Sequence, residues 1–152
     1  MKRTIILLLF LLGITGISNG QELIEKEGTY FLNGELYTGK WTTHYENGAV
    51  KMTARFKDGF KHGKTKIWFE DGTLNEIRSY KFNKMHGKWV VYNRDNIKVS
   101  VARYKNGKKH GTWKIWNDDG KLLYVLQYNN GEKSGTWKNY NEKGELINER
   151  QY

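Results

Sequence analysis

Beyond the first twenty residues, short apolar-polar alternating runs are separated by glycine-containing breaks. Within one such run, Trp113 and Ile115 fall on one face of an extended chain, and Lys114 and Trp116 fall on the other. Alternation with a period of two in runs rich in Trp, Tyr, Val, Ile and Thr predicts β-strands. The breaks contain pairs such as Asn106-Gly107, which supply the positive φ of tight hairpin turns. We therefore predict an all-β fold.

The runs belong to a repeat with a period of 24 residues. Glycines recur at this spacing at Gly39, Gly63, Gly87, Gly111 and Gly135, and Trp41, Trp89, Trp113 and Trp137 each stand two residues after one of them. Aromatic residues keep the same period at Phe56, Tyr80, Tyr104, Tyr128 and Tyr152. Each unit is predicted to contain two antiparallel strands and two turns. Consecutive hairpins laid side by side form an elongated, single, twisted antiparallel sheet, in which each unit is stabilised by its neighbours.

The first segment, residues 1–20, has the pattern of a signal peptide. Basic Lys2 and Arg3 precede an apolar stretch at 5–12, and small residues at 18–20 predict cleavage before Gln21. We therefore expect an exported protein, periplasmic or secreted, with no membrane span after cleavage. An uncleaved anchor is the alternative.

The rest of the chain divides into two parts. Residues 21–36 are predicted to form an N-terminal capping half-repeat, because Tyr30 and the Asn33-Gly34 pair match the second strand and turn of a unit. Residues 37–152 are predicted to contain five complete hairpin repeats.

The repeat resembles MORN-repeat proteins, in the 24-residue variant grouped with the bacterial YwqK family of antitoxins. The resemblance is carried by the Gly-x-Trp pairs and by the Tyr-x-x-Gly-x-x-His-Gly segment at 104–111. The aromatic residues three positions after the Trp position, Tyr92, Trp116 and Tyr140, also match. Thr65 stands where the second unit should have Trp, and His44 replaces an aromatic residue in the first. The resemblance implies a sheet that contacts proteins or lipids, with an antitoxin or immunity-like role, and no enzymatic activity.

Charge is sorted between the two turn margins. The chain has 26 Lys and Arg against 16 Asp and Glu, a net charge of +10. The turns beside the His-Gly pairs are predicted to form a basic margin and candidate binding edge, which contains Lys57, Lys61, Lys64, Lys81, Lys84, Lys88, Lys105, Lys108 and Lys109. The opposite turns are mainly acidic. The basic margin is interpreted either as a solubilising edge, as a rail for a polyanion or anionic lipid, or as a surface that meets the acidic margin of another molecule.

No catalytic, metal or cofactor site is predicted. The chain has no cysteine, which excludes disulfides, thiolate metal sites and a Cys nucleophile. His62, His86 and His110 recur at one repeat position, but equivalent residues of successive hairpins stand about 9.6 Å apart, too far to share one zinc ion. They are interpreted as turn histidines that bond locally or pack on an aromatic ring. Acidic residues at the hairpin tips form no cleft, so we predict a protein that is not an enzyme.

The aromatic residues are predicted to lie on both faces of the sheet. Trp41, Trp89, Trp113 and Trp137 form a structural row interleaved with Val91 and Ile115, and the opposite face carries a candidate binding row of Trp68, Tyr92, Trp116 and Tyr140. We expect a binding protein whose partner is a protein of the cell envelope. The alternative is an anionic lipid or an envelope polysaccharide or choline-type ligand, bound along the lysine margin and the aromatic face. A nucleic acid partner is not expected for an exported protein.

Overall fold

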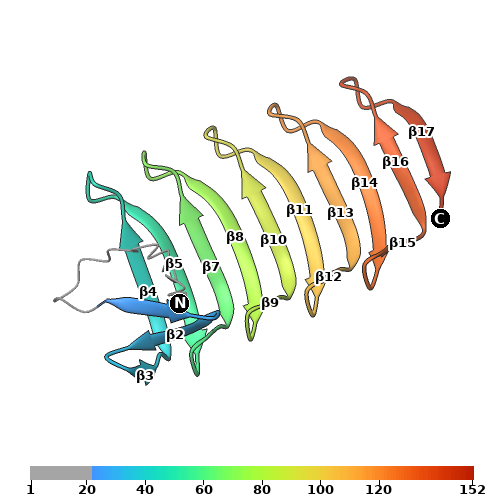
Figure 1. Ribbon diagram of the computed structural model, residues 1–152. Coiled ribbons are helices and arrows are strands. Elements are labelled where there is room, and N and C mark those ends of the chain that lie inside the picture. Colours follow the sequence, from blue (N-terminus) through green and yellow to red (C-terminus); the bar gives the residue numbers. More distant parts are fainter. Residues whose placement is uncertain (1–21) are drawn as a thin grey trace, which may run out of the picture.

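The computed structural model describes residues 22–152, and the predicted signal peptide lies outside them. The all-β prediction is confirmed for this part of the chain, which forms strands and turns without a helix. Within the same residues, no helix is long and apolar enough to cross a membrane. Figure 1 shows the strands side by side in one long, twisted layer.

Ten strands form this layer in simple antiparallel order, each beside its neighbours in sequence. They are β4 (Gly39–His44), β5 (Val50–Lys57), β7 (Gly63–Trp68), β8 (Leu74–Lys81), β10 (Gly87–Tyr92), β11 (Lys98–Lys105), β13 (Gly111–Trp116), β14 (Leu122–Asn129), β16 (Thr136–Tyr140) and β17 (Leu146–Gln151). Four two-residue strands extend the hairpins at one margin: β6 (Phe60–Lys61), β9 (Lys84–Met85), β12 (Lys108–Lys109) and β15 (Glu132–Lys133).

A separate small sheet lies at the N-terminal end. It contains β1 (Leu23–Lys26), β2 (Thr29–Leu32) and β3 (Glu35–Leu36), and it crosses the first hairpins of the long sheet (Figure 1). The fold is therefore one long sheet with a three-stranded sheet packed on it. The buried side chains of Leu23 and Tyr30 from the small sheet meet Trp41, Ala54 and Phe56 in the main hydrophobic cluster.

The two margins use different turns. At the margin with the short strands, two successive residues have positive φ, as in Asn106 (51°) and Gly107 (85°). This is the primed turn that suits hairpin twist. At the opposite margin, only the glycine of each Asn-Gly or Asp-Gly pair has positive φ. Asn83 (63°) and Asn96 (58°) take the glycine position in one turn of each kind, because asparagine tolerates positive φ better than most other residues.

Every unit also contains a β-bulge that the sequence pattern did not predict. In the fourth unit, Ile115 lies opposite Tyr124 and Trp116 lies opposite Leu122, so Leu123 has no partner. The same bulge recurs at Lys51, Asn75, Val99 and Ile147. A bulge bends its strand and increases the local right-handed twist. One bulge per unit adds the same increment of twist at each step of the sheet.

Candidate functional site

One face of the sheet carries a continuous aromatic ladder. From β8 to the C-terminal end, ring centroids of successive members lie 4.8–5.6 Å apart in the order Tyr80, Trp89, Tyr104, Trp113, Tyr128, Trp137 and Tyr152. We call this side the ladder face. The rings are tilted or edge-on to one another, the arrangement that aromatic quadrupoles favour. The direct ring neighbours of each Trp are therefore Tyr residues of adjacent strands, whereas Val91 and Ile115 lie further along the same face.

The indole groups also join neighbouring units through hydrogen bonds. Trp89 Nε1 donates to the Ser79 carbonyl (3.0 Å), Trp113 Nε1 to Arg103 (2.9 Å) and Trp137 Nε1 to Gln127 (2.8 Å). Each bond runs to the unit before. The ladder is thus a structural element that fixes the spacing between hairpins.

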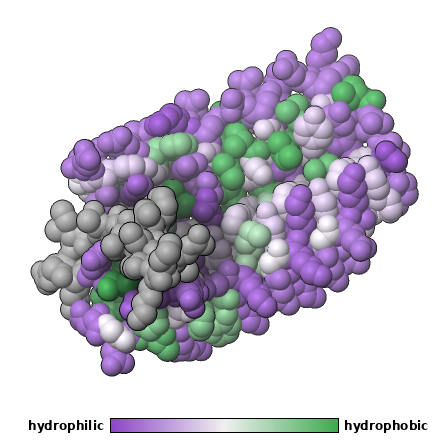
Figure 2. All heavy atoms as spheres, viewed as in Figure 1, coloured by the Kyte–Doolittle hydropathy of each residue, from purple (hydrophilic) through white to green (hydrophobic). Residues whose placement is uncertain are grey.

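Cations lie over the rings of the ladder. Lys109 Nζ is 4.8 Å from the ring centroid of Trp113 and 4.9 Å from that of Tyr128, and Lys133 Nζ takes the equivalent position over the next pair. Lys61 lies over Tyr30 and Tyr80. Figure 2 shows a less polar band across the middle of the molecule between hydrophilic margins.

The opposite face carries a row of cations, and we call it the basic face. Cross-strand pairing puts Lys40 opposite Arg55 and Lys88 opposite Arg103. The basic residues of this face between β4 and β14 are Lys40, Arg55, Lys64, Lys66, Lys88, Lys98, Arg103 and Lys114. The single carboxylate in these main strands, Glu76, lies on the ladder face opposite Ile67 and pairs with Arg78 at 2.6 Å. The face therefore has a strong positive potential.

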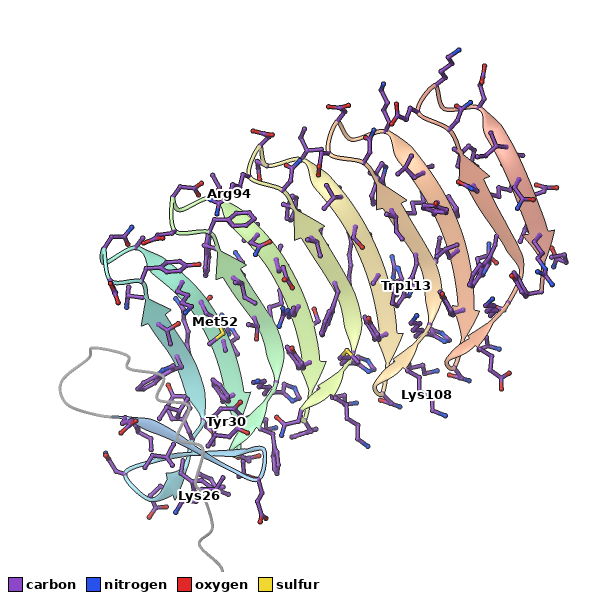
Figure 3. All side chains as sticks on the ribbon, turned by 45° about the horizontal axis from the view of Figure 1, so that its top comes forward. Lys26, Tyr30, Met52, Arg94, Lys108 and Trp113 are labelled. Atoms are coloured by element: carbon purple, nitrogen blue, oxygen red, sulfur yellow. The ribbon has the colours of Figure 1, made fainter. Side chains whose placement is uncertain are left out.

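The nine lysines predicted as a binding edge separate into three groups in space. Lys61 and Lys109 lie over the aromatic ladder. Lys64 and Lys88 point from the basic face, where Lys64 lies opposite Ser79. The remaining five stand at the hairpin tips: Lys57, Lys81, Lys84, Lys105 and Lys108. Figure 3 places Lys108 at this margin and Arg94 at the opposite one.

The cations inside the strands were not predicted as binding residues, and the main ones are Lys40, Arg55, Lys66, Arg103 and Lys114. Their proximity depends on strand register, and Lys40 and Arg55 are 15 positions apart in the sequence. The available signal was the alternation within each strand, which places Lys64 and Lys66 on one face.

The aromatic row predicted for the other face lies near the acidic margin of the basic face. Trp68 is opposite Leu74, Tyr92 is opposite Lys98, and Trp116 is opposite Leu122. Tyr140 is opposite Leu146. All four aromatic side chains are half-buried. Within the described residues no second layer covers this face, so the row is accessible from solvent.

The histidines make local contacts. The His86 imidazole accepts a hydrogen bond at Nδ1 from the Asn106 backbone (3.4 Å), and His62 packs against the Phe82 ring with centroids 4.7 Å apart. Across residues 22–152, no group of three or more His, Asp or Glu side chains is placed to hold a metal ion.

Several ionisable groups on the ladder face have displaced pKa values. Burial raises the pKa of Tyr104, and the nearby Tyr128 hydroxyl adds to the effect. Burial likewise raises the pKa of Tyr37. The hydrogen bond from Arg78 to Glu76 raises the pKa of the guanidinium, which therefore stays charged. Tyr104, Tyr37 and Arg78 thus take part in the packing and ion pairing of the ladder face.

Comparison with known families identifies the repeat. The MORN repeat variant family matches residues 37–58, 61–82 and 109–130. These segments contain the hairpins β4–β5, β7–β8 and β13–β14. The hairpins β10–β11 and β16–β17 have the same register and the same bulge. No curated protein matches the sequence. MORN repeats are generally associated with binding of proteins or membrane lipids, and proteins built from them are typically non-enzymatic scaffolds.

Proposed function

We propose that the protein is a non-enzymatic binding scaffold that attaches to an anionic membrane surface through the basic face. One observation carries the proposal: eight cations share this face from β4 to β14, and no strand residue there supplies a carboxylate. Anionic lipid head groups attract such a surface, with about 1 kcal/mol for each Lys or Arg near the membrane. A long sheet presents these cations over several units at once.

The pairing of like charges supports a role in binding. Lys40 lies directly opposite Arg55, and Lys88 lies directly opposite Arg103. Like charges at directly opposed positions destabilise an antiparallel pair of strands. The repulsion within these two pairs works against folding, and an anionic partner would remove it.

Vesicle sedimentation of the full chain tests this proposal. We expect binding to vesicles that contain phosphatidylglycerol, weak binding to phosphatidylcholine alone, and a decrease as salt is raised. The double variant Lys64→Gln/Lys88→Gln should lose about 2 kcal/mol, or roughly 30-fold in partition.

The matched control is Lys121→Gln/Lys143→Gln, which removes the same charge from the acidic margin. Both residues are exposed there. All variants keep the apolar segment at 5–12, so any contribution of that segment to membrane affinity cancels. Equal losses in the two double variants, or binding that does not respond to salt, would refute attachment through the basic face.

A protein partner is a second proposal, favoured by the edge strand β17. Its six residues are all exposed, and Leu146 and Ile147 have exposed fractions of 48% and 58%. Such an edge can add a strand from a partner. A photo-crosslinker placed at Ile147 should capture a partner protein that a photo-crosslinker at exposed Phe82 does not capture. When the crosslinker is placed at Asn148, the substitution Ile147→Lys should abolish capture of that partner. Unchanged capture contradicts the proposal.

The predicted location and the predicted antitoxin-like role are separate proposals. Export to the periplasm or beyond is supported by the sequence of residues 1–20 alone. An antitoxin or immunity role is supported by the sequence resemblance alone, because the family match concerns the repeat. Recovery of the protein from the culture medium or from the fraction released by osmotic shock tests the location, and recovery with the cytosolic fraction alone contradicts export.

A further inference from the structure

The basic face is hollowed between the first and second units. Two adjoining depressions of about 390 and 460 Å³ share Lys40, Thr53 and Trp68. We call this the Trp68 groove, and its polar and aromatic lining consists of Lys40, Thr42, Thr53, Arg55, Lys64, Lys66 and Trp68. Its volume is that of a site for a small organic molecule. The membrane proposal does not explain this local hollow.

The hollow results from two short side chains. Thr42 lies opposite Thr53 in the first hairpin, and Thr53 also lies opposite Lys66 of the next strand. In the second unit, the equivalent pair is Lys66 and Ile77, and in the fourth unit it is Lys114 and Val125. The first unit thus has two short threonines where the second and fourth units have a lysine opposite a branched aliphatic residue. The short side chains leave space above the sheet, and their hydroxyl groups line the floor of the groove.

Four cations surround this space. Lys64 and Lys66 project from the same face of one strand, about 7 Å apart, and Lys40 and Arg55 are cross-strand neighbours. Among the described residues, none of these four side chains makes a salt bridge or a side-chain hydrogen bond. All four are exposed. The groove therefore has a concentration of positive charge that the fold leaves without a counterion.

Trp68 supplies a flat apolar wall on the acidic-margin side of the groove. Its backbone carbonyl accepts a hydrogen bond from the Tyr45 hydroxyl (2.7 Å), which ties this end of β7 to the first unit. The indole ring is half-buried and borders both depressions. An indole face next to hydroxyl groups and cations suits a ring that is apolar on one side and carries hydroxyl and acidic groups.

We propose that the Trp68 groove binds an acidic saccharide, a sugar that bears a phosphate or a carboxylate. The sugar ring lies on the Trp68 indole, its hydroxyls bond to Thr42 and Thr53, and its acidic group lies between Arg55 and the lysines. Arginine forms paired hydrogen bonds with either kind of anion. This ligand goes beyond the membrane proposal, which requires charge on the face but no pocket.

Calorimetry with the full chain tests the site, with glucose 6-phosphate and glucuronate as probes. Glucose lacks the charge and inorganic phosphate lacks the ring, so each serves as a control ligand. We expect saturable binding of at least one acidic sugar in a 1:1 complex. Glucose and inorganic phosphate should each bind at least tenfold more weakly, since glucose offers only the ring and hydroxyls and phosphate offers only the charge.

Two variants and their repeat equivalents locate the binding. Trp68→Ala and Lys66→Gln should each weaken binding about tenfold or more. Trp116→Ala and Lys114→Gln change the equivalent residues two units later, and they should leave affinity unchanged. Lys66 is exposed, so Lys66→Gln keeps the test valid if Trp68→Ala does not fold.

Several results would overturn the proposal. These are equal affinity for inorganic phosphate and the acidic sugars, equal effects of the Trp68 and Trp116 variants, tighter binding of adenosine monophosphate, or no binding of either sugar. The two proposals fail separately. Trp68→Ala should retain vesicle binding, and Lys88→Gln, outside the groove, should retain sugar binding.

Discussion

Tyr30 lies against Phe56 with ring centroids 4.6 Å apart, although the two residues belong to different sheets. Lys61 lies over both Tyr30 and Tyr80, so Tyr30 stands between the rings of the first and second units. In later units this place is filled by Trp, but the second unit has the short Thr65, which is buried. The N-terminal sheet therefore completes the aromatic ladder where the repeat lacks its own ring.

Replacing Tyr30 should detach the small sheet from the long one. Its side chain is 6% exposed, and its backbone N–H donates to the Gly59 carbonyl (2.8 Å). We expect Tyr30→Ala to lower the free energy of unfolding by about 3–5 kcal/mol, the usual cost of deleting a buried aromatic ring. Urea denaturation measures this loss of unfolding free energy. Tyr124→Ala, at a 39% exposed position, should cost less than about 1 kcal/mol.

Thr65→Trp should restore the repeat pattern and yet destabilise the protein. The new indole and the Tyr30 ring compete for one place, and overpacking a core costs about 1–3 kcal/mol. In the double variant Tyr30→Ala/Thr65→Trp, the indole has room. Its loss of stability should therefore be smaller than that of the two single variants added together. Additive losses in a double-mutant cycle would show that Tyr30 does not occupy the missing Trp position.

The free energy of unfolding should fall more steeply at alkaline pH in the protein with Tyr30 than in the variant Tyr30→Phe. Burial, and then the neighbouring Glu25 carboxylate, raise the pKa of Tyr30 above its ordinary value of 10.0. The unfolded chain then releases this proton before the folded chain does. The stabilisation is complete below pH 10 and is lost as pH rises above it, by about 1.4 kcal/mol per pH unit. Tyr30→Phe should have a shallower slope above pH 10 in denaturation titrations, and equal slopes would contradict the assignment.

The repeat glycines should differ in their tolerance of asparagine. Gly48 has a φ of 84° with open space around it, and Asn96 occupies the equivalent turn of the third unit. Gly48→Asn should therefore change stability by less than about 0.5 kcal/mol. Gly111 has a φ of 68°, and a Cβ there would lie 3.3 Å from Arg103 Cδ. We expect Gly111→Asn to cost about 1–3 kcal/mol, as measured by thermal unfolding.

The fold was predictable because its information is periodic and local. The spacing of the Gly-x-Trp pairs indicated the length of the repeat unit. Alternation within runs such as 113–116 indicated which side chains share a face of the sheet, and the Asn-Gly pairs indicated the turns. The bulge was not predictable from these signals, since it depends on which residues oppose one another across the strands. The position of Tyr30 was also hidden, because its partners Phe56 and Lys61 lie in other units.

The candidate site was predictable only in its chemistry. Lysine content and the aromatic row indicated an anionic or ring-shaped partner, but the predicted lysine margin divides between two faces and the hairpin tips. The Trp68 groove arises because Thr42, Thr53 and Trp68 come from three strands whose register brings them together. No run of the sequence contains that arrangement.

Contacts between ladder rings of adjacent hairpins have a consequence for how such a chain can change in length. A deletion that removes one whole period, such as residues 89–112, would join Lys88 to Trp113, so that Gly87 stands two residues before Trp113 as Gly111 does now. The two hairpins joined by the deletion would then pack against each other as any other pair of adjacent hairpins in the sheet does. A cut one residue longer or shorter would turn side chains to the wrong face. Insertion or deletion of complete 24-residue repeats is therefore the change in length that is compatible with this fold.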